Sequence, residues 1–320
     1  GKRAMACEFD VIMNPGAPDQ VGAASEALDL IDALEDQMTV YRDQGELVEL
    51  NRVAAESPTP VEPQLYGLLR RAAEYSQELE GAFDLTSGPL ITLWRQAREV
   101  GHPPSAEEIA EARKLVGMNF VQFEDEGCRV SFTQPGVALN LGSIGKGYAL
   151  DRAGQFLLER GVNEFSLIAG GSSLVARGGH AGYTGWPVSL QHPVLRHRKL
   201  GTLMLKNAGM SSSGSTVQFF EFDDRRYGHV IDPRTGWPTD ELLTVTVVAQ
   251  TAERAEALST AFFVLGVEKA LDSCHNHPDV AAVLPPRPTP GRTLQPLVVG
   301  LTEAELAPAS PEEPLTFISH

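Results

Sequence analysis

Residues 139–154, LNLGSIGKGYALDRAG, are the stretch from which the fold of this chain can be worked out. The apolar run from Val137 to Leu141 predicts a strand, and the residues from Tyr148 onward predict a helix that ends near Gly161. Between them lie Lys146 and three glycines, at positions 142, 145 and 147. Glycine permits positive φ and lets a ligand approach the main chain closely. A lysine at a helix start favours an anion, so the stretch predicts a strand–turn–helix that holds a phosphate.

The glycine pattern differs from two common nucleotide-binding motifs. A P-loop needs a glycine five residues before Gly145, where Asn140 stands, and Ser or Thr after the lysine, where Gly147 stands. The spacing also differs from that of the dinucleotide fingerprint. Taken alone, the stretch is better explained by a tight turn whose lysine points into water, so other motifs must decide.

Composition excludes several classes of protein. The chain has 320 residues, 42 % of them apolar, and a formal net charge of −16. This charge argues against nucleic acid or an anionic membrane as the main partner. Its three cysteines are far apart and give neither a disulfide framework nor a zinc site. We find no transmembrane run and no signal peptide, although the abrupt start at Gly1 leaves room for a removed targeting segment.

The order of periodic segments predicts an α+β fold. We expect one domain over residues 1–300, with a mostly antiparallel sheet and helices on the outside, and then an extended acidic, proline-rich tail over 301–320. The clearest expected elements are a strand over 4–13, helices over 61–80, 105–117 and 251–266, and a hairpin over 120–132.

A second chemical motif is YGHVIDPRTGWP, residues 227–238. A histidine here, His229, is suited to act as a base near neutral pH, and a carboxylate such as Asp232 is suited to fix its tautomer. The simpler interpretation is an Asx-turn capped by Asp232, with His229 on the surface at a strand end.

A third candidate lies in the predicted helix over 251–266. Glu256 and Thr260 are four residues apart and so share a helix face, where a carboxylate and a hydroxyl suit Mg²⁺. Ordinary solvation of a helix is the alternative for one such pair. In GAFDLTSGPL, Asp84 and Thr86 are interpreted as turn formers, and the His275/His277 pair as loop residues.

Taken together, seven segments in order resemble the ApbE-type flavin transferases, the FAD:protein FMN transferases. The resemblance covers roughly residues 4–300 and rests on EDQMTVYRDQGELVELN, GAFDLTSGPLITLW, LNLGSIGKGYALDRA, LIAGG, SSSGSTVQFF, HVIDPRTGWP and AEALSTAFFVLG. It implies a fold related to the tunnelling fold. It also implies binding of FAD and Mg²⁺, and transfer of FMN to a threonine of an acceptor protein with release of AMP. The compartment stays open, with a periplasmic or membrane-anchored location as the expectation from the family.

The resemblance also implies roles for individual residues. The implied metal ligands are the Gly145 carbonyl, Glu256 and the Thr260 hydroxyl, and His229 is our candidate base. The positions implied to contact the flavin nucleotide are Met5, Tyr41, Asp84, Lys146, Gly170, Gly171, Asp232 and Thr235.

Three departures from the family pattern bear on activity. Glu256 stands where the family has Asp, Ser172 replaces the acid of Gly-Gly-Asp, and Met5-Ala6-Cys7 replaces Met-Gly-Thr. Two readings therefore stay open: an active Mg²⁺-dependent transferase, and an FAD-binding relative without transferase activity that serves as a carrier, sensor or assembly partner. A third, that residues 213–216 (SGST) are themselves an acceptor site, is disfavoured because the family has its own Ser-Gly turn there.

Overall fold

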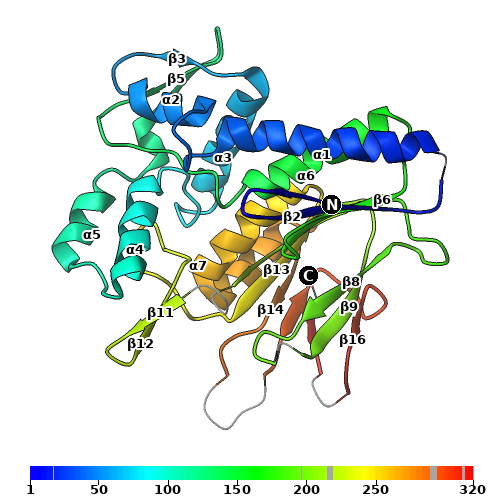
Figure 1. The fold of residues 1–320 in the computed structure, drawn as a ribbon. Helices are drawn as coiled ribbons and strands as arrows, with labels where there is room; N and C mark the ends of the chain where they lie inside the picture. The colour runs from blue at the N-terminus through cyan, green and yellow to red at the C-terminus, as the bar shows by residue number, and fades with distance from the viewer. Residues whose placement is uncertain (17, 196, 215–218, 289–293, 312–313, 320) are drawn as a thin grey trace. The chain divides into compact units, whose positions relative to one another are not determined.

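The computed structural model describes residues 1–16, 18–195, 197–214, 219–288, 294–311 and 314–319 (Figure 1). The chain divides into two compact units. The first unit is Gly1–Leu34, Ile144–Thr216 and Glu241–His320, and the second is Glu35–Ser143 and Val217–Asp240. None of the described helices combines the length and apolar character needed to cross a bilayer.

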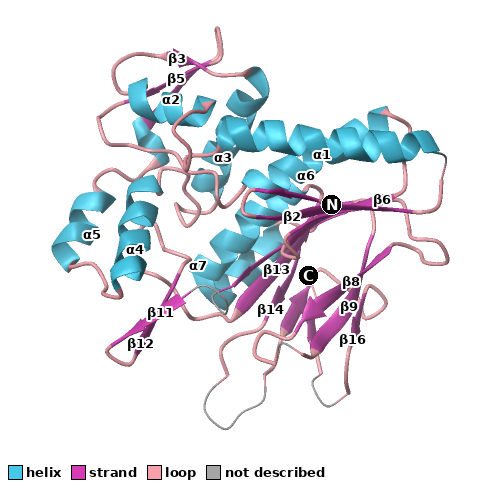
Figure 2. Ribbon diagram, viewed as in Figure 1, coloured by secondary structure: helices cyan, strands magenta, loops and turns pink. Residues whose placement is uncertain are grey.

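The first unit is built on a nine-stranded sheet, shown in magenta in Figure 2. Its strands, in spatial order, are β1 (Lys2–Ala4), β2 (Cys7–Met13), β6 (Phe165–Ala169), β7 (Ser173–Arg177), β10 (Ala208–Gly214), β13 (Thr244–Ala249), β14 (Ala281–Leu284), β15 (Leu297–Val299) and β17 (Thr316–Ile318). Every neighbouring pair is antiparallel except β15 and β17. The mostly antiparallel α+β fold predicted from the sequence is therefore confirmed.

The two faces of this sheet are covered differently. Helices α6 (Gly145–Glu159) and α7 (Ala252–Asn276) pack against one face. A three-stranded sheet of β16 (Leu306–Pro308), β9 (Lys199–Leu205) and β8 (Trp186–Gln191) packs against the other. Side chains alternate along each strand. In β7, for example, Leu174 joins the apolar core with the small sheet, while Ser173 contacts α7.

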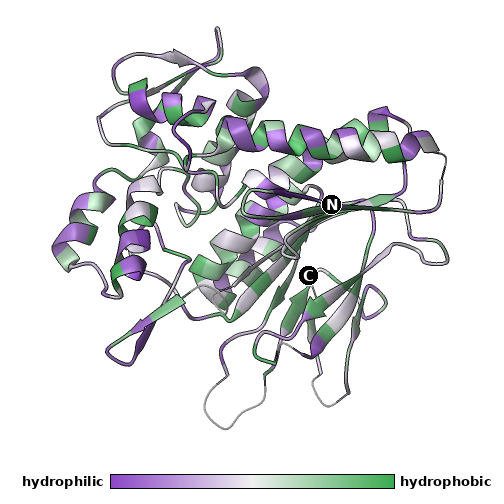
Figure 3. Ribbon diagram, viewed as in Figure 1, coloured by the Kyte–Doolittle hydropathy of each residue, from purple (hydrophilic) through white to green (hydrophobic). Residues whose placement is uncertain are grey.

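Helix α1 (Pro18–Met38) is amphipathic, and its residues up to Leu34 belong to the first unit. Figure 3 shows hydrophobic and hydrophilic positions alternating along it. The buried positions Ala27, Ile31, Leu34 and Met38 recur at helical spacing. Burial of this apolar stripe, rather than propensity alone, is what stabilises the helix.

The described part of the second unit includes the helices α2 (Glu46–Val53), α3 (Pro63–Glu78), α4 (Gly88–Val100) and α5 (Ala106–Arg113), and the short 3₁₀ helix η1 (Met118–Phe120). Its strands are β3 (Thr59–Pro60), β4 (Val121–Glu124) and β5 (Arg129–Phe132), and the hairpin of β11 (Phe219–Phe222) with β12 (Arg225–Gly228). Trp94 of α4 stacks on Tyr227 at 5.6 Å between ring centroids, which fixes this hairpin on α4. A capping box of Ser105 and Glu108 begins α5, within the helix predicted over 105–117.

Several boundaries differ from the sequence prediction. The expected strand over 4–13 is a hairpin, because Met5 and Ala6 form a two-residue turn with positive φ. Gly266 interrupts the helix at the predicted place, but helical residues continue to Asn276, so His275 is helical rather than in a loop.

The last twenty residues also contribute to the sheets of the first unit. Within 301–320, β16 pairs with β9 and β17 pairs with β15. The apolar side chains of Leu306 and Leu315 are buried in the core of the first unit, and this burial stabilises the packing of the proline-rich stretch. The single domain over 1–300 stays a prediction. Residues 215 and 216 of the proposed acceptor segment lie outside the described residues.

Candidate functional site

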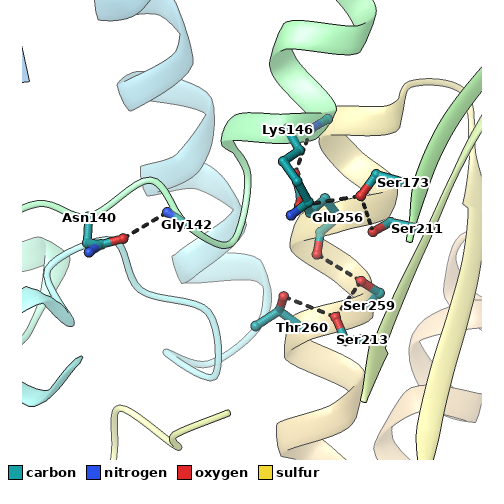
Figure 4. A network of polar contacts seen from close by, with 10 residues as sticks. Asn140, Gly142, Lys146, Ser173, Ser211, Ser213, Glu256, Ser259 and Thr260 are labelled. Carbon is teal, nitrogen blue, oxygen red and sulfur yellow. Dashed lines mark hydrogen bonds and ion pairs between the residues drawn. The ribbon is translucent and has the colours of Figure 1, made fainter. Parts of the chain in front are cut away.

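The starts of helices α6 and α7 are joined by two carboxylates, those of Asp151 and Glu256. Figure 4 shows Glu256, which is buried. Asp151 of α6 accepts hydrogen bonds from the backbone N–H groups of Ala252 (3.0 Å) and Glu253 (2.8 Å), the first residues of α7. Glu256 of α7 accepts one from Gly147 N–H (2.6 Å), in the first turn of α6. Each helix thus provides the acid that satisfies unpaired N–H groups at the start of the other.

The prediction of a glycine-rich turn around Lys146 is wrong. Helix α6 begins at Gly145, so Lys146 and Gly147 are already helical, and none of the three glycines has positive φ. A Cβ on Gly147 would lie 2.3 Å from the carbonyl oxygen of Ala252. Gly147 therefore allows close approach of the backbone of α7, not of a ligand.

The side chain of Lys146 is held in an ion pair with Glu256. The Glu256 side chain is 4 % exposed and that of Lys146 is 23 % exposed. Burial by itself would lower the pKa of the lysine, but the adjacent carboxylate outweighs it, and the pKa of Lys146 is raised above its usual value. The lysine is therefore charged, and it does not simply point into water.

Hydroxyl groups extend from this ion pair along β7, β10 and α7 (Figure 4). Ser173 lies 3.5 Å from Oε1 of Glu256 and 3.2 Å from the Ser211 hydroxyl. One turn further along α7, the hydroxyls of Ser259 and Thr260 lie 2.9 Å and 3.4 Å from the hydroxyl of Ser213 in β10. Sequence reasoning missed these serines, because only the pairing of β7 with β10 places them opposite α7.

Two turns of the same unit carry other predicted site residues. Gly170 and Gly171, both with positive φ, form the turn between β6 and β7 together with Ser172. A Cβ on Gly170 would lie 2.8 Å from that of Cys7, which follows the Met5–Ala6 turn. The first unit therefore holds the candidates Met5, Gly145, Lys146, Gly170, Gly171, Glu256 and Thr260.

The second unit holds the remaining candidates, and Asp84 is one of the two that are buried. Its Oδ1 accepts from the Thr86 N–H (2.8 Å) and hydroxyl (2.5 Å), and its Oδ2 accepts from Met118 N–H (3.1 Å). Burial raises the pKa of Asp84, while these hydrogen bonds oppose the shift. The predicted turn role of this pair is present. Asp84 also lines a pocket of about 490 Å³ together with residues that include Met118 and Arg234.

The loop after β12 forms the Asx-turn that we gave as the simpler interpretation. Asp232 accepts from the Arg234 backbone N–H and binds its guanidinium through two further bonds, all 2.9 Å. The hydrogen bonds from Arg234 thus occupy this carboxylate, so orientation of His229 by Asp232 stays a prediction. His229 is exposed at the end of β12, and Thr235 is exposed within the loop.

Tyr41, another of the predicted nucleotide contacts, is 63 % exposed. Its hydroxyl accepts a hydrogen bond from the Asn140 side-chain amide at 3.2 Å, and the Arg95 guanidinium lies 5.3 Å from its ring centroid. These contacts fix the ring while leaving one face to solvent.

Among the described residues, no group of three or more His, Cys, Asp or Glu side chains is arranged to hold a metal ion. The implied metal site has one carboxylate and neutral oxygen ligands, so it would not contain three such side chains. Glu256 and Thr260 do lie on the same side of α7, one turn apart, as their spacing predicted.

Comparison with known proteins places these residues in a family. A model of the ApbE family matches residues 5–284. The chain belongs to the ApbE family. The seven sequence segments therefore led to the right family, and the matched range includes every candidate site residue named above.

Several members of the ApbE family are similar over most of this chain. The FAD:protein FMN transferase of Klebsiella pneumoniae (strain 342) is 32 % identical over 263 residues, which is 81 % of each chain. That of Escherichia coli (strain K12) is 30 % identical over 246 residues, 75 % of this chain and 70 % of the relative.

Solved structures of the family share the fold. The crystal structure of the ApbE protein from Thermotoga maritima MSB8 has a TM-score of 0.81 and 27 % identity, covering 89 % of this chain and 93 % of that one. The flavin transferase ApbE from Vibrio cholerae has a TM-score of 0.80 at 24 % identity, covering 93 % and 95 %, and supports the fold alone.

Proposed function

We propose that this protein is a Mg²⁺-dependent FAD:protein FMN transferase, which moves FMN from FAD to a threonine hydroxyl of an acceptor protein and releases AMP. The observation that carries the proposal is the charged Lys146 in the first turn of α6, paired with Glu256 of α7, which lies one helical turn from Thr260. Relatives at about 30 % identity over most of the chain bear the name of this activity.

The oxygen atoms of the proposed metal ligands suit Mg²⁺ in their chemistry. Mg²⁺ prefers oxygen ligands, often one or two carboxylates with waters and phosphate oxygens. The Glu256 carboxylate, the Thr260 hydroxyl and the Gly145 carbonyl meet this chemistry. The group that must give way is the Lys146 ammonium, which is paired with Glu256 Oε1. When bound, Mg²⁺ would offset negative charge on the pyrophosphate of FAD.

The remaining residues are proposed to bind, orient and accept a proton. Lys146 attracts the pyrophosphate, and the contacts proposed for the flavin nucleotide are those of Met5, Tyr41, Asp84, Gly170, Gly171, Asp232 and Thr235. The threonine oxygen of the acceptor attacks the phosphorus of the FMN half, and the bond from that phosphorus to the AMP oxygen breaks. His229 takes the proton from the hydroxyl, and AMP leaves with the bonding electron pair.

A second candidate function is FAD binding without transfer, and one observation favours it. Both oxygens of Glu256 already have partners, since Lys146 occupies Oε1 and Gly147 N–H occupies Oε2. A carboxylate satisfied in this way can serve as a helix cap alone. The protein would then act as a flavin carrier, sensor or assembly partner.

One experiment separates the two candidates. The protein is incubated with FAD, Mg²⁺ and a peptide that contains Ser-Gly-Ala-Thr, beside a matched peptide with Ala in place of Thr. Covalent flavin and equimolar AMP with the threonine peptide alone, both abolished by EDTA, are expected for the transferase. Saturable FAD binding without either product would reject the transferase and support the binding function.

A further inference from the structure

The ion pair between Lys146 and Glu256 joins two groups that the proposed function needs for different ligands. The lysine is the cation available to the pyrophosphate, and the glutamate is the carboxylate available to Mg²⁺. In the structure each group neutralises the other. Neither ligand can take its group without breaking the same contact.

Breaking this contact for one ligand alone is unfavourable. The Glu256 side chain is almost fully buried, and its other described donors, Gly147 N–H and the Ser173 hydroxyl, are neutral. A buried carboxylate that loses its only described charged partner is strongly disfavoured. If the nucleotide draws away Lys146, Glu256 gains affinity for a cation, and if a cation takes Glu256, Lys146 is released to the phosphates.

We propose that Lys146 couples the two ligands: it is the counter-ion of Glu256 in the empty protein, and its transfer to the nucleotide makes divalent-cation and FAD binding mutually dependent. This inference rests on the proposed function for the identity of the ligands. It predicts an effect of opposite sign on each ligand when the lysine is removed. A merely structural lysine would not do this, because a damaged site loses affinity for both ligands.

The test uses MnCl₂, followed by electron paramagnetic resonance, and FAD, followed by flavin fluorescence. In the parent protein, saturating FAD should strengthen Mn²⁺ binding about 5–150-fold, and Mn²⁺ should strengthen FAD binding by the same factor. Lys146→Met should bind Mn²⁺ more tightly than the parent when FAD is absent, and should bind FAD more weakly. Its coupling factor should fall toward one.

Two further variants act as controls. Lys206→Met removes the same charge from an exposed position of the first unit and should change neither affinity. Lys146→Gln repeats the test with a polar side chain if the methionine variant fails to fold, as judged by circular dichroism.

Several results would overturn the coupling. These are Mn²⁺ binding that is unchanged or weaker without the lysine, coupling that survives its removal, and absence of Mn²⁺ or FAD binding in the parent. Failure of the proposed function gives a different result. Loss of AMP release with the coupling intact would reject the transferase but keep the role of Lys146, whereas transfer without coupling would reject only the coupling.

Discussion

Asp151 in α6 and Glu256 in α7 cap each other's helices. Asp151 accepts the backbone N–H groups that begin α7, and Glu256 accepts one from the first turn of α6. Because each carboxylate belongs to the opposite helix, the two helix starts are held together at the point where Lys146 is also fixed. The exchange of caps fixes the position of the two helix starts relative to each other.

The close approach of the two helices can be tested at Gly147. Gly147→Ala should lower the free energy of unfolding by about 2–4 kcal/mol, because the new Cβ would overlap the backbone of Ala252. Urea denaturation measures this.

The matched control for Gly147 is Gly22→Ala in α1. Gly22 is exposed, and a Cβ there meets no atom within 4 Å. This variant should be stabilised by about 0.5–1 kcal/mol, because alanine is the better helix former. A Gly147→Ala protein as stable as the parent would show that the helices are not in close contact at this residue.

The Asp151 carboxyl should make stability depend on pH. Burial raises the pKa of Asp151 to about 7, whereas its ordinary value is 3.8. The folded protein then binds a proton that the unfolded chain lacks between these values, so the contribution is full below about pH 4 and is lost as the pH rises to about 7. Asp151→Asn should remove this loss, which is at most about 4 kcal/mol at 1.36 kcal/mol per pKa unit.

Urea denaturation at pH 5, 6, 7 and 8 compares the parent protein with Asp151→Asn. The exposed Asp279→Asn serves as the control and should follow the parent at every pH. A constant difference between parent and Asp151→Asn across this range would mean that Asp151 is ionised throughout.

Glu256→Asp should separate the structural and the metal-binding roles of this acid. The shorter side chain withdraws the carboxylate by about 1.5 Å, a single C–C bond, from Gly147 N–H and Lys146. We expect the free energy of unfolding to fall by about 1–3 kcal/mol. We also expect Mg²⁺ affinity and AMP release to rise. Thr260→Ala should lower Mg²⁺ affinity.

The Glu256 experiment measures AMP release against Mg²⁺ concentration, with Glu256→Gln as the uncharged control of nearly equal size. The control should lose Mg²⁺ dependence. High activity of the parent at low Mg²⁺, with a fall in the Asp variant, would show that glutamate is already a good ligand, and the binding-only function would then be excluded.

His229→Ala should leave FAD binding largely intact and slow transfer by roughly 10²–10⁴-fold, the usual effect of a lost general base. The exposed His197→Ala is the matched control and should transfer at the parent rate. Loss of FAD affinity with a normal rate of transfer from bound FAD would make His229 a binding residue instead.

The family, the α+β class and most of the elements near the candidate site could be predicted from the amino-acid sequence. These features depend on local periodicity and on short segments in order, which a single chain displays directly. The predicted spacing of Glu256 and Thr260 on one helix face holds for the same reason, since a helix repeats every 3.6 residues.

The contacts of Lys146, Gly147 and Asp151 could not be predicted in this way, because they depend on how the helices pack. Their partners lie about 100 residues further along the chain, in α7, and no local pattern reports such a distance. From the sequence we interpreted Gly147 as a residue of a flexible turn. Glycine is suited both to a turn and to close contact between helices, so the residue type alone does not distinguish the two. The packing of α6 against α7 on one face of the sheet shows that Gly147 serves the contact between helices. The same packing pairs Lys146, which we expected to bind a phosphate, with the buried carboxylate of Glu256.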